Sequence, residues 1–171
     1  MKTKAILINE SDWTAPILKK VDSLKANLPG NQACLVVGIA GGSCTGKSSQ
    51  VAKVLLCHFS TQAQLLAQDN YQKGIQLSNY FEFKYHWDDP ANFGIEESRQ
   101  MLETLKKGGE IDMPVYSFEK KRQIGYEKIC STPIVFFEGL YACDSHIKPV
   151  LDLSIYVESP LYGRLLRRVF R

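Results

Sequence analysis

Four short and nearly continuous apolar runs divide this chain, at residues 35–40, 63–67, 134–137 and 153–157. Runs of this length are typical of parallel strands that are buried on both faces of a sheet. Between the runs, apolar residues recur every three or four positions, which is the period of an amphipathic helix. Strands that alternate with helices predict an α/β fold with a doubly wound parallel sheet, in three layers α/β/α.

The segments between and around the strands predict helices. The first ends at Pro29-Gly30, and the second has an apolar face made of Val51, Val54, Leu55 and Phe59. Because the first helix precedes the first long strand, we expect an N-terminal helical extension over residues 1–33 and the main α/β domain over residues 34–171. The expected helices cover residues 12–30, 49–59, 95–107 and 161–171.

The loop after the first long strand carries the most specific chemical signal. Two glycines, separated by four residues, are followed directly by Lys47 and Ser48, which is the pattern of a phosphate-binding loop. Backbone N–H groups at the start of a helix, together with Lys47, are expected to bind the phosphates of ATP or GTP, while the Ser48 hydroxyl holds Mg²⁺. The alternative is a glycine-rich connection that binds nothing, which leaves Lys47 and Ser48 without a role. The predicted nucleotide-binding residues are Gly41, Gly42, Ser43, Cys44, Thr45, Gly46, Lys47 and Ser48.

Two carboxylates follow apolar runs directly. Asp69 comes just after the second run, and Glu138 after the third. Ligands of an open parallel sheet bind beyond the carboxyl ends of its strands, so both should face the phosphate loop across one crevice. Glu138 is expected to hold Mg²⁺ directly or through water, and Asp69 to accept a proton from an attacking hydroxyl or to share the metal. The alternative for each is an ordinary helix cap.

The last predicted helix has a basic face. Arg164, Arg167, Arg168 and Arg171 lie on one side of it, opposite its apolar residues. This pattern has two interpretations. The basic face only contacts solvent, or its arginines stabilise a phosphoryl group during transfer.

Length and composition narrow the function class. A chain of 171 residues with a net charge of +3 suits a single domain and gives no indication of nucleic acid as a partner. Its apolar runs fall far short of the roughly 20 residues of a membrane span, so no membrane partner is expected. Five cysteines without a Cys-x-x-Cys pair indicate reduced thiols in a cytoplasmic protein rather than disulfides or a zinc site.

From about Cys34 to the end, the chain resembles the uridine kinase family, within a wider P-loop group that includes phosphoribulokinases and pantothenate kinases. The similarity lies in several separate segments in the same order. They are the strand and phosphate loop at 37–43, Gln68-Asp69-Asn70-Tyr71, Trp87-Asp88-Asp89-Pro90, the segment Asp112 to Phe118, Phe137-Glu138-Gly139-Leu140, and Arg164 to Arg171.

This resemblance implies a role for each matching residue. Lys47 and Asp69 are implied as catalytic residues, and Ser48, Glu138 and Asp69 as the Mg²⁺ site. The implied substrate-binding residues are Asp88 at the ribose hydroxyls, Tyr116 and Phe118 along the nucleoside pocket, and Arg168 near the acceptor, while Arg171 approaches the ATP phosphates.

The chain departs from the family at the base-recognition site. Gln72 stands where the family commonly has a second aromatic residue after the catalytic Asp. Lys120 stands in for a His that recognises the pyrimidine, and Arg122 matches the Arg that follows. Lysine offers three donors and no acceptor, which suits the carbonyls of uracil and also an anionic acceptor.

We therefore expect an ATP-dependent phosphotransferase that acts on a small-molecule hydroxyl, with uridine or cytidine favoured. Two kinds of alternative remain. The acceptor could be another riboside, a pantothenate-like molecule or a sugar phosphate, or the chain could be a nucleotide-binding module with little turnover. The family's lid continues past the last helix, whereas this chain stops at Arg171, as a fragment or a natural minimal form. Slow turnover and self-association through an open sheet edge are expected as a result.

Overall fold

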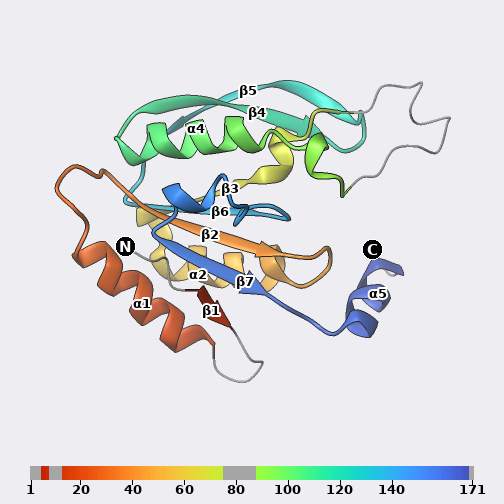
Figure 1. Cartoon of the computed structure of the whole chain (residues 1–171), viewed down its shortest axis with the longest axis horizontal. Helices are drawn as coiled ribbons and strands as arrows, with labels where there is room; N and C mark the ends of the chain where they lie inside the picture. The colour runs from red at the N-terminus through yellow and green to blue at the C-terminus, as the bar shows by residue number, and fades with distance from the viewer. Residues whose placement is uncertain (1–4, 8–12, 75–87, 170–171) are drawn as a thin grey trace.

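The structure is a computed structural model, and it describes residues 5–7, 13–74 and 88–169 (Figure 1). Its strands are β1 (Ala5–Leu7), β2 (Leu35–Gly41), β3 (Ala63–Ala67), β4 (Glu110–Ser117), β5 (Arg122–Cys130), β6 (Ile134–Gly139) and β7 (Leu153–Val157). The α-helices are α1 (Thr14–Ala26), α2 (Lys53–Phe59), α4 (Ile95–Lys106) and α5 (Leu161–Val169). A π-helical turn covers Lys47–Ala52, and 3₁₀ turns cover Ser60–Gln62, Gln68–Tyr71, Pro90–Asn92 and Lys148–Val150.

The central sheet is parallel and has the strand order β1-β7-β2-β6-β3. The strand that carries the phosphate loop, β2, therefore lies between β7 and β6. In the register, Ala40 of β2 lies opposite Gly139 of β6, and Ala67 of β3 lies opposite Glu138. The carboxyl ends of β2, β6 and β3 consequently meet at one edge of the sheet.

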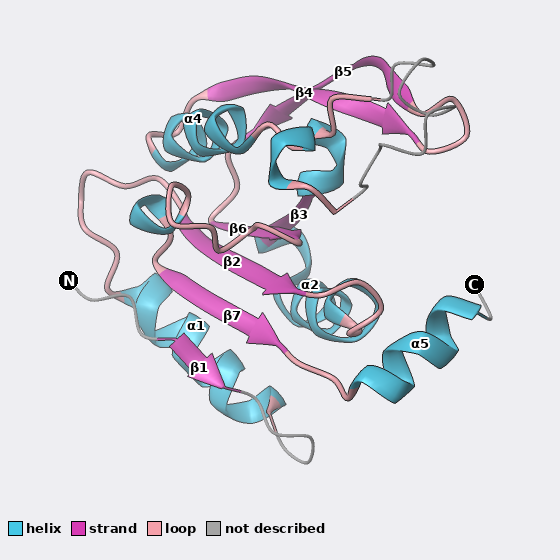
Figure 2. Cartoon of the chain, turned by 45° about the vertical axis from the view of Figure 1, so that its right-hand side comes forward, coloured by secondary structure: helices cyan, strands magenta, loops and turns pink. Residues whose placement is uncertain are grey.

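Helices lie on both faces of the central sheet (Figure 2). Two apolar cores, one on each face, hold the layers together. Alternate residues of the central strands point to opposite faces, as the pleat of a strand requires. Val37, Ile39 and Phe136 pack against α1 and α2, whereas Val36, Val135 and Phe137 pack against α4 and the hairpin of β4 and β5. This three-layer parallel fold confirms the fold class predicted from the sequence.

The structure adds strands that the apolar pattern does not predict. One is the short β1, which pairs in parallel with β7 and brings the N-terminal segment into the same sheet. The others are β4 and β5, which form a separate antiparallel sheet. Nearly every residue of β5 is exposed, so this strand has no alternation of buried and exposed residues to mark it in the sequence. The boundary predicted at residue 33 stays a prediction.

The helix after the phosphate loop differs from expectation in two ways. It begins at Lys47 as a π-helical turn, and α2 follows from Lys53. Val51, Leu55 and Phe59 are buried as predicted, but Val54 is 38% exposed, so its place on the apolar face was wrong. The π-helical turn changes the angular spacing of the residues that follow it, which accounts for the displacement.

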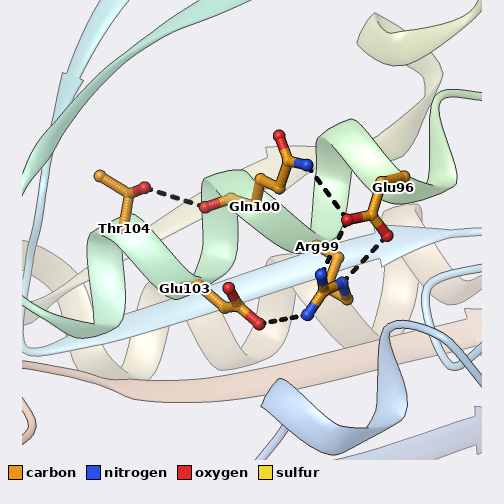
Figure 3. A network of polar contacts seen from close by, with 5 residues as sticks. All are labelled: Glu96, Arg99, Gln100, Glu103 and Thr104. Carbon is orange, nitrogen blue, oxygen red and sulfur yellow. Dashed lines mark hydrogen bonds and ion pairs between the residues drawn. The ribbon is translucent and has the colours of Figure 1, made fainter.

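The buried face of α4 covers the sheet, and its exposed face carries a charged network (Figure 3). Arg99 lies between Glu96, at 2.7 Å from Nη2, and Glu103, at 2.5 Å from Nη1. Ion pairs at this helical spacing stabilise the helix itself, by about 0.3–0.5 kcal/mol for an exposed pair. No helix in the described part of the chain has the length and apolar character needed to cross a membrane.

Candidate active site

The phosphate loop joins β2 to the π-helical turn through two left-handed residues. Cys44 has φ of 61° and Gly46 has φ of 93°, and a non-glycine residue in this region is uncommon. Such alternation of backbone conformation turns successive N–H groups toward one point, which creates an anion site. Within the described residues, no backbone carbonyl accepts a hydrogen bond from the amides of Ser43, Cys44 or Gly46. The loop therefore fits phosphate oxygens.

Close packing fixes the shape of this loop. A Cβ atom on Gly41 would lie 2.5 Å from the Val157 carbonyl of β7, so only glycine fits where the loop leaves the sheet. The Thr45 hydroxyl donates to the Gly42 carbonyl at 2.9 Å and closes the loop from within. At its far end the Gly46 carbonyl accepts from the amides of two successive residues, Gln50 at 2.9 Å and Val51 at 3.3 Å.

A cavity of about 900 Å³ opens next to the loop, within the size range of small-molecule sites. It brings together groups from every region that the sequence singles out. The loop and the turn after it contribute Ser43, Cys44, Gly46, Lys47, Ser48, Ser49 and Gln50. The other lining residues are Asp69, Gln72, Asp88, Phe93, Phe118, Glu138, Leu140, Arg167 and Arg168.

The two strand-end carboxylates lie in this cavity with Ser48. The Ser48 hydroxyl donates to Glu138 Oε2 at 2.8 Å, and Glu138 is only 9% exposed. Glu138 lies within β6, and Asp69 lies in the 3₁₀ turn Gln68–Tyr71 that follows β3. Hydroxyl and carboxylate oxygens are the ligands that Mg²⁺ accepts, and phosphate and water usually complete its coordination. The donor set at Ser48 and Glu138 therefore fits a magnesium ion.

Two aromatic side chains and Asp88 also line the cavity. Phe93 comes from the segment after Asp88, and Phe118 comes from the end of β4. Tyr116 packs edge-on against Phe118, with ring centroids 5.2 Å apart, and its amide donates to the Asn70 side chain at 3.1 Å. Asn70 follows Asp69 directly, so this hydrogen bond connects the β4–β5 hairpin to the turn that carries Asp69, the predicted general base.

Some predicted residues lie elsewhere. Tyr116 is buried within β4, Lys120 lies exposed on the turn after β4, and Arg122 is the exposed first residue of β5. None of the three lines the cavity. Arg171 lies outside the described residues. The roles assigned to these four residues stay predictions.

The basic face of α5 points to the phosphate loop. Arg164 Nε donates to the Ser43 carbonyl at 3.0 Å, and Arg167 Nη1 donates to the Cys44 carbonyl at 2.9 Å. Arg167 and Arg168 also line the cavity, so this face is not simply in contact with solvent. The opposite face of α5 is exposed, at Leu161, Leu165, Leu166 and Val169.

The sequence did not reveal two residues that tie the site together. Gln68 is fully buried, and its side-chain carbonyl accepts from the Tyr141 amide at 2.8 Å. The Tyr141 hydroxyl in turn donates to the Asp88 carbonyl. Partial burial, and then the nearby carboxylates of Asp88, Asp89 and Asp144, raise the pKa of Tyr141. Both contacts join residues far apart in the chain, so no local pattern could have indicated them.

Comparison with known proteins agrees with this geometry. The profile of the Phosphoribulokinase / Uridine kinase family matches residues 36–171. A uridine kinase of Borrelia garinii subsp. bavariensis is 34% identical over 138 residues, which cover 80% of this chain and 66% of that protein. The chain thus spans about two thirds of the length of the curated uridine kinases it resembles. The inorganic pyrophosphatase TTM2 of Arabidopsis thaliana is 30% identical over 143 residues, which cover 82% of this chain and 20% of that protein.

A similar fold occurs among solved structures. A candidate fructose transport system kinase from Silicibacter sp. TM1040 superposes with a TM-score of 0.70 at 17% identity. The match covers 89% of this chain and 80% of the other, and at this identity it concerns the fold alone. The match of the family profile, by contrast, runs from residue 36 to residue 171 and so covers most of the chain. The chain therefore belongs to the phosphoribulokinase/uridine kinase family.

Proposed function

We propose that this chain binds Mg·ATP and transfers the γ-phosphoryl group to a hydroxyl of a small molecule, with uridine or cytidine as the favoured acceptor. The observation that carries the proposal is one cavity lined by the phosphate-loop residues Lys47 and Ser48 and by the carboxylates of Asp69 and Glu138. A phosphate site, a metal site and a proton acceptor are the parts that phosphoryl transfer to a hydroxyl requires.

In the proposed reaction, the loop holds the nucleotide and each remaining group has one task. The amides of Ser43, Cys44 and Gly46 donate to phosphate oxygens, and Lys47 neutralises charge on the terminal phosphates. Ser48 and Glu138 would hold Mg²⁺, which would supply positive charge to the phosphates when bound.

Asp69 acts as the general base on the acceptor. Its carboxylate takes the proton of the attacking hydroxyl as the new O–P bond forms and the bond to the β-phosphate oxygen breaks, releasing ADP. Arg167 and Arg168, which line the cavity, add positive charge near the group in transfer.

Three further lining residues support a nucleoside as the acceptor. Phe93 and Phe118 offer aromatic surface for a flat base, and Asp88 offers a carboxylate that can accept from ribose hydroxyls. The resemblance to a uridine kinase at 34% identity points the same way. The test must separate this proposal from two kinds of alternative. One is a different acceptor, such as another riboside, a pantothenate-like molecule or a sugar phosphate, and the other is nucleotide binding with little turnover.

A screen with γ-labelled ATP and Mg²⁺ tests the proposal. Uridine, cytidine, other ribosides, pantothenate and a sugar phosphate are offered in separate reactions, with a Lys47→Ala variant as the control. The proposal expects label in the monophosphate of uridine or cytidine and none with the variant. Binding of Mg·ATP without transfer to any acceptor would favour the nucleotide-binding module, and cleavage of pyrophosphate in place of transfer would contradict the kinase assignment.

A further inference from the structure

Tyr141, two residues after β6, contacts three separate parts of the site. Its amide donates to the Gln68 side chain at 2.8 Å, and its hydroxyl donates to the backbone carbonyl of Asp88. Its ring packs edge-on against Phe93, with centroids 5.3 Å apart and an interplanar angle of 63°. Phe93 and Asp88 both line the cavity, whereas Tyr141 itself does not.

The segment that carries Asp88 is anchored at its other end by the backbone. The Lys73 amide donates to the Asn92 carbonyl at 2.8 Å, and the Gly94 amide donates to the Tyr71 carbonyl at 2.9 Å. These bonds fix the end of the segment that leads into α4. At the Asp88 end, the bond from the Tyr141 hydroxyl joins the segment to the sheet.

Tyr141 is itself held rigidly relative to both strand-end carboxylates. Gln68 precedes Asp69 directly and is fully buried, and Ala67 beside it pairs with Glu138 across the sheet. Gly139 has no side chain, and the Gln68 side chain fills the space where a Cβ atom would lie. The hydrogen bond from the Tyr141 amide to the Gln68 side chain therefore connects the two strand ends just beyond the last pair of the ladder.

We propose that Tyr141 is a positioning residue for the acceptor, because its hydroxyl sets the place of Asp88 relative to Asp69 and Glu138. This inference rests on the proposed function, in which Asp88 binds the acceptor. Tyr141 holds the backbone of Asp88 and leaves the carboxylate of that residue available to a ligand. Burial and the surrounding carboxylates raise the pKa of Tyr141, so its phenol stays protonated and able to donate at neutral pH.

The Tyr141→Phe variant removes the hydroxyl. It keeps the packing of the ring against Phe93 and the hydrogen bond from the backbone amide to Gln68. The KM for uridine should rise about two- to tenfold, the range that one hydrogen bond supplies, while the KM for ATP stays unchanged. Because Asp88 holds the acceptor equally before and during transfer, kcat should change little. Tyr126→Phe is the matched control, since Tyr126 is 72% exposed on β5, away from the cavity, and neither KM should change.

Hydrogen–deuterium exchange supplies a readout that needs no turnover. In the variant, the amides of residues 88–93 should exchange faster than in the wild type, and those of the phosphate loop should not. A uniform loss of thermal stability with equal changes in both KM values, or unchanged exchange at 88–93, would overturn the inference. If the wild type phosphorylates no acceptor, the proposed function fails, and the exchange comparison still decides whether Tyr141 positions Asp88.

Discussion

The substitution Gly41→Ala tests how the phosphate loop leaves the sheet. The added Cβ would lie 2.5 Å from the Val157 carbonyl and 2.9 Å from Thr45 Oγ1, whereas ordinary contacts begin at 3.4 Å. The carbonyl belongs to the backbone of β7 and cannot turn away, so the loop must move by several tenths of an ångström. Such a movement displaces the amides of Ser43 and Cys44 that are proposed to bind phosphate.

Two effects follow, and their sizes can be estimated. Overpacking of this kind costs about 1–3 kcal/mol, and the smaller conformational freedom of alanine in the unfolded chain offsets about 0.4–1 kcal/mol of it. The net loss of up to about 2.6 kcal/mol corresponds to a decrease in Tm of up to about 10 °C for a domain of this size. Loss of one hydrogen bond to a charged phosphate should weaken Mg·ATP binding about ten- to hundredfold, which isothermal titration calorimetry measures.

Two other glycines provide controls for this prediction. In Gly38→Ala the added Cβ would lie 2.6 Å from Leu151 Cδ1, so a similar loss of stability is expected, but the site lies within β2 and nucleotide affinity should not change. In Gly125→Ala nothing lies within 4 Å, and stability should change by less than about 0.5 kcal/mol. Equal effects of Gly38→Ala and Gly41→Ala on nucleotide affinity would refute the reasoning, because general destabilisation would then explain both.

Three further predictions follow from other contacts. Lys106→Met should lower the free energy of unfolding by about 1–3 kcal/mol in urea titrations, because it leaves the largely buried Asp152, 2.7 Å from Lys106 Nζ, without its cation. Hydrogen bonds from its arginine neighbour lower the pKa of Glu96 from 4.5 to about 2, so its stabilising effect should be full above pH 4.5 and lost as the pH falls through 2. The difference in unfolding free energy between wild type and Glu96→Gln should shrink over that range, and a constant difference would contradict it. Finally, bound Mg·ATP should slow alkylation of Cys44, which lines the cavity, and leave the rate at the exposed Cys57 unchanged; equal protection of both would count against the site.

The sequence predicted the parts of this fold whose signal is local. The strands β2, β3, β6 and β7 have nearly continuous apolar runs, and the phosphate loop has its own residue pattern, so both could be identified without the structure. Asp69 and Glu138 were placed correctly in one cavity because carboxyl ends of parallel strands meet at one edge of the sheet. The hairpin could not be predicted, because β5 is exposed along nearly its whole length and Pro114 lies inside β4, where a proline counts against a strand.

The finer structure of the site depends on contacts between distant residues. Tyr141 is 73 residues from Gln68 and 53 from Asp88, and nothing in the local sequence indicates either hydrogen bond. Likewise, the placement of Lys120 near the base was inferred from its position in the segment after Phe118. The structure puts it on an exposed turn, whose direction depends on the bulge between Val115 and Tyr116 and on the left-handed Lys121.

The central claim is that phosphoryl transfer takes place in this one cavity, with Asp69 as the general base. Its most direct test compares the wild type with Asp69→Asn, measuring Mg·ATP affinity by calorimetry and transfer of label from γ-labelled ATP to uridine. Asparagine keeps the size and hydrogen bonding of the side chain but accepts no proton, so the rate of transfer should fall about a hundred- to ten-thousandfold. The affinity for Mg·ATP should change far less than that rate. Transfer by Asp69→Asn at near the wild-type rate, or an equal loss of affinity and rate, would contradict the assignment of Asp69 as the base.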